Sequence, residues 1–99
     1  MPVDNSRIPG LYNKSVEQRK EAISQKTGIS MDELAVFDID KGLSLDKADN
    51  MIENVIGTMS LPIGVATNFL IDGQEYIIPF CVEESSIVAA ASNIAKRCR

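Results

Sequence analysis

Two adjacent acids, Glu83 and Glu84, are the residues whose type and position could do chemistry. They separate two apolar runs, so we expect them where a strand ends and a helix begins. Two explanations are open. The acids could stabilise the helix dipole, with Ser85 and Ser86 as its N-cap residues. Alternatively, one acid faces a cleft, where desolvation raises its pKa and lets it donate a proton, and the serines bind a substrate.

The chain contains no histidine, which excludes several kinds of site. A Ser-His or Cys-His nucleophile pair and a histidine-based metal site cannot form within it. Cys81 and Cys98 lack CxxC spacing, and we interpret them as buried or incidental thiols. No metal site is predicted, and any catalysis must depend on carboxylates, hydroxyls or lysines.

Charge and length exclude further classes of function. Acidic residues outnumber basic ones by 14 to 10, giving a net charge of −4, and no Lys/Arg run occurs, so neither nucleic acid nor an anionic membrane is an expected partner. The 99 residues are enough for one domain with a thin core, which argues against a complete two-substrate enzyme. No apolar stretch has the length of a membrane span and no signal peptide is recognised, so a cytoplasmic location is expected.

Capping signals predict three short helices in the first half of the chain, behind an extended arm over residues 1–14 that we expect to pack on a partner. Each helix begins with a serine that can cap it, and a glutamine or glutamate three residues later can complete a capping box in the first two. The predicted helices are residues 16–27 between Ser15 and Gly28, a helix after Ser30 that ends near Lys41-Gly42, and a helix after Ser44 with an apolar stripe through Val55.

The second half predicts a β-hairpin and a long helix. Residues 61–71 alternate, Asp72-Gly73 is a preferred pair for a type I′ turn, and a second strand follows over residues 75–82. Pro79 cannot donate a ladder hydrogen bond, so its strand is either an edge at that point or carries a bulge. Residues 85–99 form an amphipathic helix. The predicted fold class is α+β.

Two further segments are unusual, although each has an ordinary structural explanation. Polar and apolar residues are mixed in Glu53-Asn54-Val55-Ile56-Gly57, which could be a helix C-terminus capped by the glycine. Gly64 lies early in the first predicted strand, where a glycine often marks a bulge or the close approach of another backbone.

Three segments in order, residues 51–57, 61–66 and 82–92, together resemble hydroxymethylglutaryl-CoA reductase. Ser6–Gly10 followed by a serine-led helix is similar to the amino terminus of class II of that family, the soluble bacterial and archaeal type. The resemblance covers essentially the whole chain. Because chains of the family are several times longer, it corresponds to their amino-terminal portion only.

The resemblance implies NAD(P)H-dependent interconversion of hydroxymethylglutaryl-CoA with mevalonate and CoA, in isoprenoid biosynthesis or mevalonate degradation. By alignment, Glu84 rather than Glu83 is the catalytic acid, which exchanges a proton with the carbonyl-derived oxygen of a mevaldehyde-level intermediate. Ser86 matches a residue that contacts the hydroxymethylglutaryl group, and Ile87 one that lines its pocket. The segment Glu53–Gly57 matches a motif at a dimer interface, so a homodimer or a higher assembly of dimers is implied.

The resemblance also implies an organisation. Residues 1–14 would be an amino-terminal arm, and residues 15–99 the first part of a larger substrate-binding and dimerisation domain, truncated relative to the family. NADH or NADPH would be bound by parts of the family's chain that have no match here, so the 99-residue chain alone is expected to be inactive. The alternative is a small noncatalytic protein-interaction module that retains the motifs as scaffold.

Overall fold

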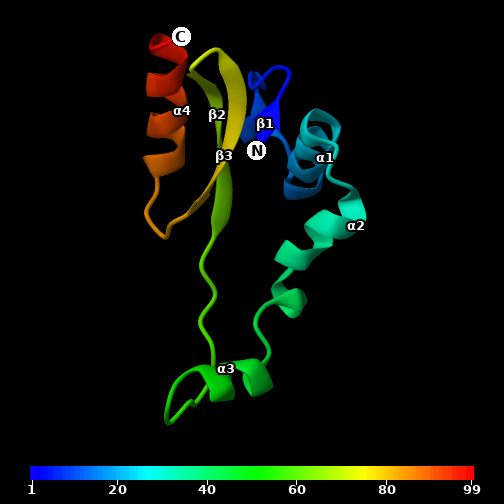
Figure 1. Ribbon diagram of the computed structural model, residues 1–99, viewed down its shortest axis with the longest axis vertical. Helices are drawn as coiled ribbons and strands as arrows, with labels where there is room; N and C mark the ends of the chain where they lie inside the picture. The colour runs from blue at the N-terminus through cyan, green and yellow to red at the C-terminus, as the bar shows by residue number, and fades with distance from the viewer.

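The computed structural model describes residues 1–99, apart from the side chain of Ile39. Its elements are mainly short helices in the first half and a hairpin and a helix in the second, which confirms the predicted α+β class (Figure 1). Their bounds are β1 Pro2–Val3, η1 Leu11–Asn13, α1 Val16–Thr27, α2 Met31–Leu34, η2 Ala35–Phe37, η3 Ile39–Lys41, α3 Leu45–Met51, β2 Ile63–Ile71, β3 Gln74–Cys81 and α4 Ile87–Arg97, where η marks a 3-10 helix.

Helix α1 begins and ends at the predicted residues. Ser15 Oγ accepts the Gln18 N–H at 3.2 Å, and Gln18 Oε1 accepts the Ser15 N–H at 3.0 Å, which completes a capping box. Gly28 ends the helix in the left-handed conformation, with φ 76°. Since a Cβ is disfavoured there, glycine suits this position.

The next two helices are shorter than their apolar patterns suggest. Ser30 and Ser44 both cap as predicted, and the 3-10 turns that follow α2 end at Lys41. However, α3 ends at Met51, because Ile52 is already extended. Val55 is therefore not on the helix. A short apolar stripe without a packing partner does not hold a helix together, and most of this stripe is exposed.

In the described chain the sheet has three antiparallel strands, in the order β1-β3-β2. The hairpin turns at Asp72-Gly73 with φ 50° and 80°, as a type I′ turn requires. Strand β1 was not predicted: Pro2 pairs with Tyr76 and Val3 with Glu75. The arm that we expected to pack on a partner thus packs on its own sheet, because Val3 is buried in the core there.

Pro79 stands where β3 becomes an edge, the first of the two predicted alternatives. On the β1 side, the Ile77 N–H donates to Met1 O at 2.9 Å, and Ile77 O accepts from the Met1 ammonium at 3.1 Å. The next residue facing that side is Pro79, which has no N–H to donate. On the β2 side of the strand, Pro79 lies opposite Val65.

Strand β2 contains a bulge that the alternating pattern did not predict. Thr67 and Asn68 together lie opposite Ile77, and Asn68 has φ 71°. Asparagine tolerates this left-handed conformation better than most residues. The extra residue bends β2 next to α4.

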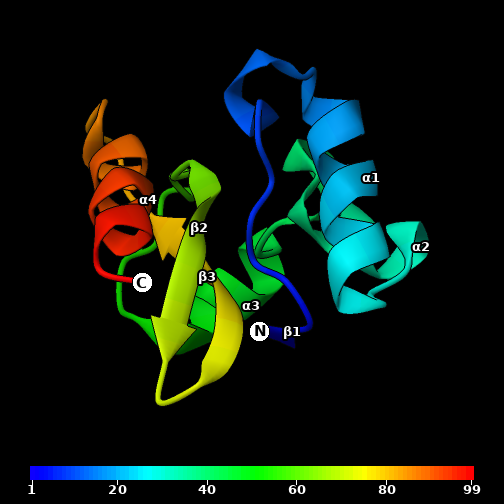
Figure 2. The same ribbon diagram turned by 90° about the horizontal axis from the view of Figure 1, so that it is seen from above.

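Different helices cover the two faces of the sheet (Figure 2). On one face, the fully buried Ile77 packs with Val3, Ile23 and Leu34 from β1, α1 and α2. Helix α4 packs on the other face. Helix α3 lies apart, joined to β2 by the extended residues 52–62, and the molecule measures 47 × 27 × 26 Å (Figure 1). None of the described helices has the length and apolar character needed to cross a membrane.

Candidate functional site

Residues 83–87 lie at the junction between β3 and α4, where the sequence predicted them. Beyond Cys81, the last residue of β3, the Val82 N–H still donates to Pro62 O at 3.2 Å. The chain then bends at the two glutamates and turns at the two serines before α4 begins. These side chains and that of Ile87 are exposed, so a ligand can reach them from outside the fold.

Ser86 precedes α4 in a strained conformation. It occupies the N-cap position with φ 72°, its side chain makes no capping hydrogen bond, and the first turn of α4 contains no acid. The interpretation of Glu83 and Glu84 as dipole-stabilising acids with serine caps is therefore wrong. A left-handed residue other than glycine costs about 1–2 kcal/mol. Such residues concentrate at functional sites.

Gly64 lies beside the first turn of α4, but its neighbour there is a side chain and not the close backbone or the bulge that was predicted for a glycine in this strand. A Cβ at Gly64 would lie 3.4 Å from Cγ2 of Val88 in the first turn of α4. The beginning of α4, and with it the junction that carries Glu84, is thus seated directly on the start of β2.

Residues 53–57 form a turn and an extended segment after α3 rather than the end of a helix. Asn54 has φ 60°, whereas Gly57 has no positive φ, so the interpretation of Gly57 as a helix cap is wrong. The reason is that α3 has already ended at Met51. Ile56 is fully exposed, with a relative accessibility of 101%, and Val55 is half-buried. A large apolar side chain is thus left uncovered by the rest of this chain.

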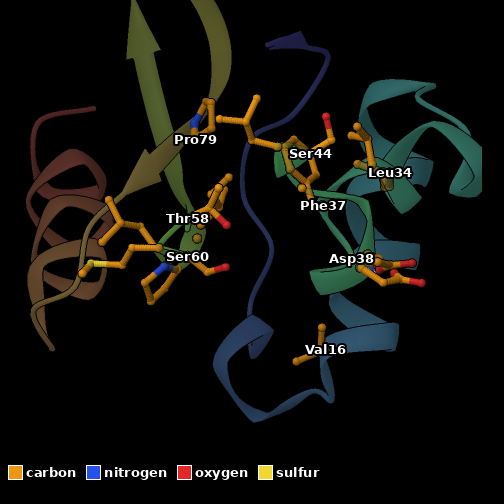
Figure 3. A pocket seen from close by; sticks show the side chains of 18 of the residues that line it. Val16, Leu34, Phe37, Asp38, Ser44, Thr58, Ser60 and Pro79 are labelled. Atoms are coloured by element: carbon orange, nitrogen blue, oxygen red, sulfur yellow. The ribbon is translucent and has the colours of Figure 1, made fainter. Parts of the chain in front are cut away.

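A wide groove of about 1320 Å³ separates the helical half of the chain from the start of β2. Thr58 and Ser60 lie on one side of it, and Leu34, Phe37 and Asp38 lie on the other (Figure 3). Val55 and Gly57 contribute to its lining, but no residue of 83–87 does. The structure therefore does not bring the Glu53–Gly57 segment and the Glu84 junction into one cavity.

The sequence profile of hydroxymethylglutaryl-coenzyme A reductase matches residues 15–99. The chain belongs to this family. The family predicted from the three ordered segments is thus confirmed, and so is its character as an oxidoreductase family.

The chain is 55% identical to the 3-hydroxy-3-methylglutaryl-coenzyme A reductase of Archaeoglobus fulgidus over 95 residues. The aligned part is 96% of this chain and 22% of the relative. It is 32% identical to the reductase of Pyrococcus abyssi over 89 residues, 86% of this chain and 21% of the relative. The chain thus spans about a fifth of the length of these relatives.

The fold is also that of a solved class II reductase. The enzyme from Streptococcus pneumoniae bound to NADPH superposes with a TM-score of 0.79 and 39% identity, over 89% of this chain and 24% of that chain. A second structure of the Streptococcus pneumoniae reductase gives the same TM-score and identity. The chain matches a portion of this α+β enzyme, as the class II resemblance predicted.

A partly buried ionic cluster was not predicted from the sequence. Arg99 Nη2 donates to Glu75 Oε2 at 2.5 Å, while Glu75 Oε1 accepts the Ser6 N–H at 2.9 Å and the Ser6 hydroxyl at 3.0 Å. The bonds from Ser6, then that from Arg99, lower the pKa of Glu75 from 4.5 to about 2. One acid in a strand and one arginine far along the chain have no spacing that could have revealed this pairing.

A second ion pair lies in the helical half of the chain. Lys20 of α1 pairs with Asp38, and this hydrogen bond raises the pKa of the lysine. Within the part of the chain that the structure describes, no three His, Cys, Asp or Glu side chains are grouped so that they could hold a metal ion. Both cysteines are free and exposed, so of the two interpretations, buried or incidental thiols, the buried one is wrong.

Proposed function

We propose that this chain forms part of the active site of a hydroxymethylglutaryl-CoA reductase, which interconverts hydroxymethylglutaryl-CoA with mevalonate and CoA by two hydride transfers from NADH or NADPH. The observation that carries the proposal is the 55% identity to the Archaeoglobus fulgidus reductase over 96% of the chain. A location in the cytoplasm, expected from the sequence, belongs to the same proposal.

Glu84 is the proposed catalytic acid. Its position supports the role, because it is an exposed carboxyl on a bent segment between a strand and a helix, reachable from outside the fold. A carboxylic acid there can give a proton to the oxygen that develops from the substrate carbonyl during reduction, and can take it back in the reverse direction. Glu83 is its neighbour in the bend.

Ser86 and Ile87 are proposed to contact the hydroxymethylglutaryl group. Both are exposed and follow Glu84 directly, so a substrate at Glu84 lies within their reach. The left-handed backbone conformation of Ser86 sets the direction in which the side chains of Ser86 and Ile87 project from the junction. A hydroxyl can hydrogen-bond the substrate, and the isoleucine can cover its methyl group.

The described residues do not fit a nicotinamide dinucleotide. A pyrophosphate is normally bound by a glycine-rich turn from a strand into a helix. The turn from β3 into α4 instead carries Glu83 and Glu84, whose negative charge opposes a phosphate. The cofactor would therefore supply the hydrides from another part of the active site.

The segment Glu53–Gly57 is proposed to lie at the interface of a homodimer, or of a higher assembly of dimers. In the same proposal, residues 1–14 are an amino-terminal arm, and residues 15–99 are the first part of the domain that binds substrate and dimerises. The full exposure of Ile56 and the separation of this segment from the rest of the fold support the proposal. An apolar side chain of this size gains stability when a partner covers it.

A coupled assay tests the function in the complete protein encoded by the gene. Oxidation of NADH and of NADPH is followed separately with hydroxymethylglutaryl-CoA, for wild type, Glu84→Gln and Glu83→Gln. We expect turnover with at least one nucleotide, and a loss of about 100-fold or more in Glu84→Gln, because a positioned acid contributes about 10²–10⁴-fold.

Each result decides a separate part of the proposal. Loss of turnover in Glu83→Gln with retention in Glu84→Gln would move the catalytic role to the other acid. A folded wild type without turnover on either nucleotide would contradict the reductase function and favour the noncatalytic interaction module.

A further inference from the structure

Two hydrogen bonds join the middle of α4 to the bulge of β2. The Thr67 N–H donates to Ser92 Oγ at 2.9 Å, and Asn68 Nδ2 donates to Ser92 O at 3.1 Å. Both donors are the bulge residues themselves. The rest of the contact between α4 and β2 is packing of side chains such as Val88. Directional bonds at a defined place fix the register of two packed surfaces, which apolar contacts alone do less well.

The bulge is also bonded to the amino-terminal arm and to Arg99, which lies two residues beyond the end of α4. The Asn68 N–H donates to Ser6 O at 3.0 Å, and Asn68 O accepts from Arg99 Nη1 at 2.8 Å. Ser6 is fully buried, and both Ser6 and Arg99 are bonded to Glu75. The left-handed Asn68 is thus bonded through its backbone N–H, its backbone oxygen and its side chain, so it offers α4 a rigid attachment point.

The attachment point is close to the junction with Glu84. Ser92 lies five residues after Ile87, about 7.5 Å along a helix that rises about 1.5 Å per residue. Val88 and Ser92 are four residues apart and therefore share the face of α4 that meets β2. A helix moves as a rigid body. A change in the position of Ser92 on β2 therefore also moves the beginning of α4 and the bend before it.

We propose that Asn68 and Ser92 are positioning residues of the reductase, which hold α4 in register on β2 and thereby set where Glu84 and Ser86 meet the substrate. This inference rests on the proposed function of Glu84. Neither residue touches the substrate, so both act through the placement of the junction.

The test compares variants of the complete protein that remove one hydrogen bond each. Ser92→Ala removes the hydroxyl, and Asn68→Gly removes the amide but keeps a residue that adopts a positive φ without strain. Ser30→Ala is the matched control, because Ser30 Oγ also accepts one backbone N–H, from Glu33 at 3.1 Å, but in α2. All variants are compared per folded molecule, by circular dichroism and melting temperature.

We expect kcat to fall about 10- to 100-fold in Ser92→Ala and in Asn68→Gly, because small misplacements of a catalytic group cost this much. The KM for the nicotinamide nucleotide should stay near the wild-type value. The double variant should lose little more than either single variant, since both bonds serve one contact. Ser30→Ala should keep the wild-type kcat. A merely structural role would lower melting temperatures without changing kcat per folded molecule.

A second measurement does not depend on activity. Hydrogen exchange of the amides of residues 83–87 should be faster in Ser92→Ala than in wild type and Ser30→Ala. Wild-type turnover that is lost in Glu84→Gln but kept in both bond-deleting variants would overturn the inference while the proposed function stands. If the wild type shows no turnover, the function fails, and unchanged exchange would then overturn the positioning role separately.

Discussion

Arg99 and Glu75 form an ion pair that joins the segment after α4 to strand β3 of the hairpin. The pair is largely shielded from water, since the two side chains keep 12% and 13% of their accessibility. Both oxygens of the Glu75 carboxylate are hydrogen-bonded, because Ser6 supplies the remaining donors. These bonds offset part of the cost of shielding the pair from water, although Arg99 Nε is buried without a hydrogen-bond partner among the described residues. Amino-terminal arm, hairpin and α4 are therefore coupled through one carboxylate.

The ion pair predicts acid sensitivity. The pKa of Glu75 is lowered to about 2 in the folded state, against 4.5 for an unperturbed carboxyl. A lowered pKa means that the unfolded chain binds the proton more readily, so the contribution of Glu75 is complete above pH 4.5 and is lost as the pH falls toward 2. Wild type and Glu75→Gln are unfolded with urea at a series of pH values. Between pH 4.5 and pH 2, the free energy of unfolding should fall more steeply with decreasing pH for wild type than for Glu75→Gln.

Glu33→Gln is the control for the pH series, because Glu33 is an exposed acid of α2 without an ion-pair partner among the described residues. It should follow the wild-type pH dependence. Parallel curves for wild type and Glu75→Gln between these pH values would contradict the role of the carboxylate.

Local signals predicted the elements well. Ser15 with Gln18, Gly28 and Asp72-Gly73 each define a conformation through bonds or dihedral angles among neighbouring residues, and each was found as predicted. The position of the candidate acids followed from the same reasoning, because they separate two apolar runs. The prediction for Gly64 was wrong, because it marks neither a bulge nor a close backbone approach: the atoms nearest to a Cβ at this position belong to the side chain of Val88.

Features that depend on distant residues could not be predicted. Strand β1 exists because Val3 completes a core with Ile77, more than seventy residues away along the chain. The bulge at Asn68 is bonded by Ser6 and Arg99, which no local pattern connects to it. The early end of α3 likewise reflects the lack of a packing partner in this chain rather than a stop signal in the sequence.

The capping box of α1 should contribute measurably to stability. Ser15→Ala leaves the Gln18 N–H without its acceptor, and loss of a serine cap costs about 0.5–2 kcal/mol. Ser24→Ala is the matched control, since it makes the same substitution inside α1 without removing a cap. Chemical denaturation of both variants should show a lower free energy of unfolding for Ser15→Ala only. An equal loss in the two variants would contradict the capping role.

Ser86 allows the backbone and the hydroxyl to be tested separately. At φ 72°, glycine is favoured over residues with a Cβ, so Ser86→Gly should be more stable than Ser86→Ala by about 1 kcal/mol. Both variants lack the hydroxyl proposed to bind substrate, so both should raise the KM for hydroxymethylglutaryl-CoA. Thermal unfolding and steady-state kinetics of the complete protein measure the two effects. A wild-type KM in both variants would remove Ser86 from the substrate site.

Gly64 should tolerate alanine but not a larger side chain. A Cβ there meets Val88 Cγ2 at 3.4 Å, an ordinary contact distance, so Gly64→Ala should fold with little loss of stability. Gly64→Leu has no room under α4 and should cost about 1–3 kcal/mol, the usual range for overpacking. Denaturant unfolding distinguishes the two. Equal stability of both variants would show that α4 can move away from β2 without cost.

Ile56 should control assembly if Glu53–Gly57 lies between subunits. The side chain is fully exposed in this chain, so replacing it with aspartate removes no contact within the fold and should leave the circular dichroism spectrum unchanged. At an interface, however, the buried carboxylate would have no partner, which is strongly unfavourable. Sedimentation of the complete protein should therefore show dissociation for Ile56→Asp. Ile71→Asp, at the exposed end of the hairpin, is the control and should assemble as wild type does. An Ile56→Asp protein that assembles normally would contradict the interface assignment.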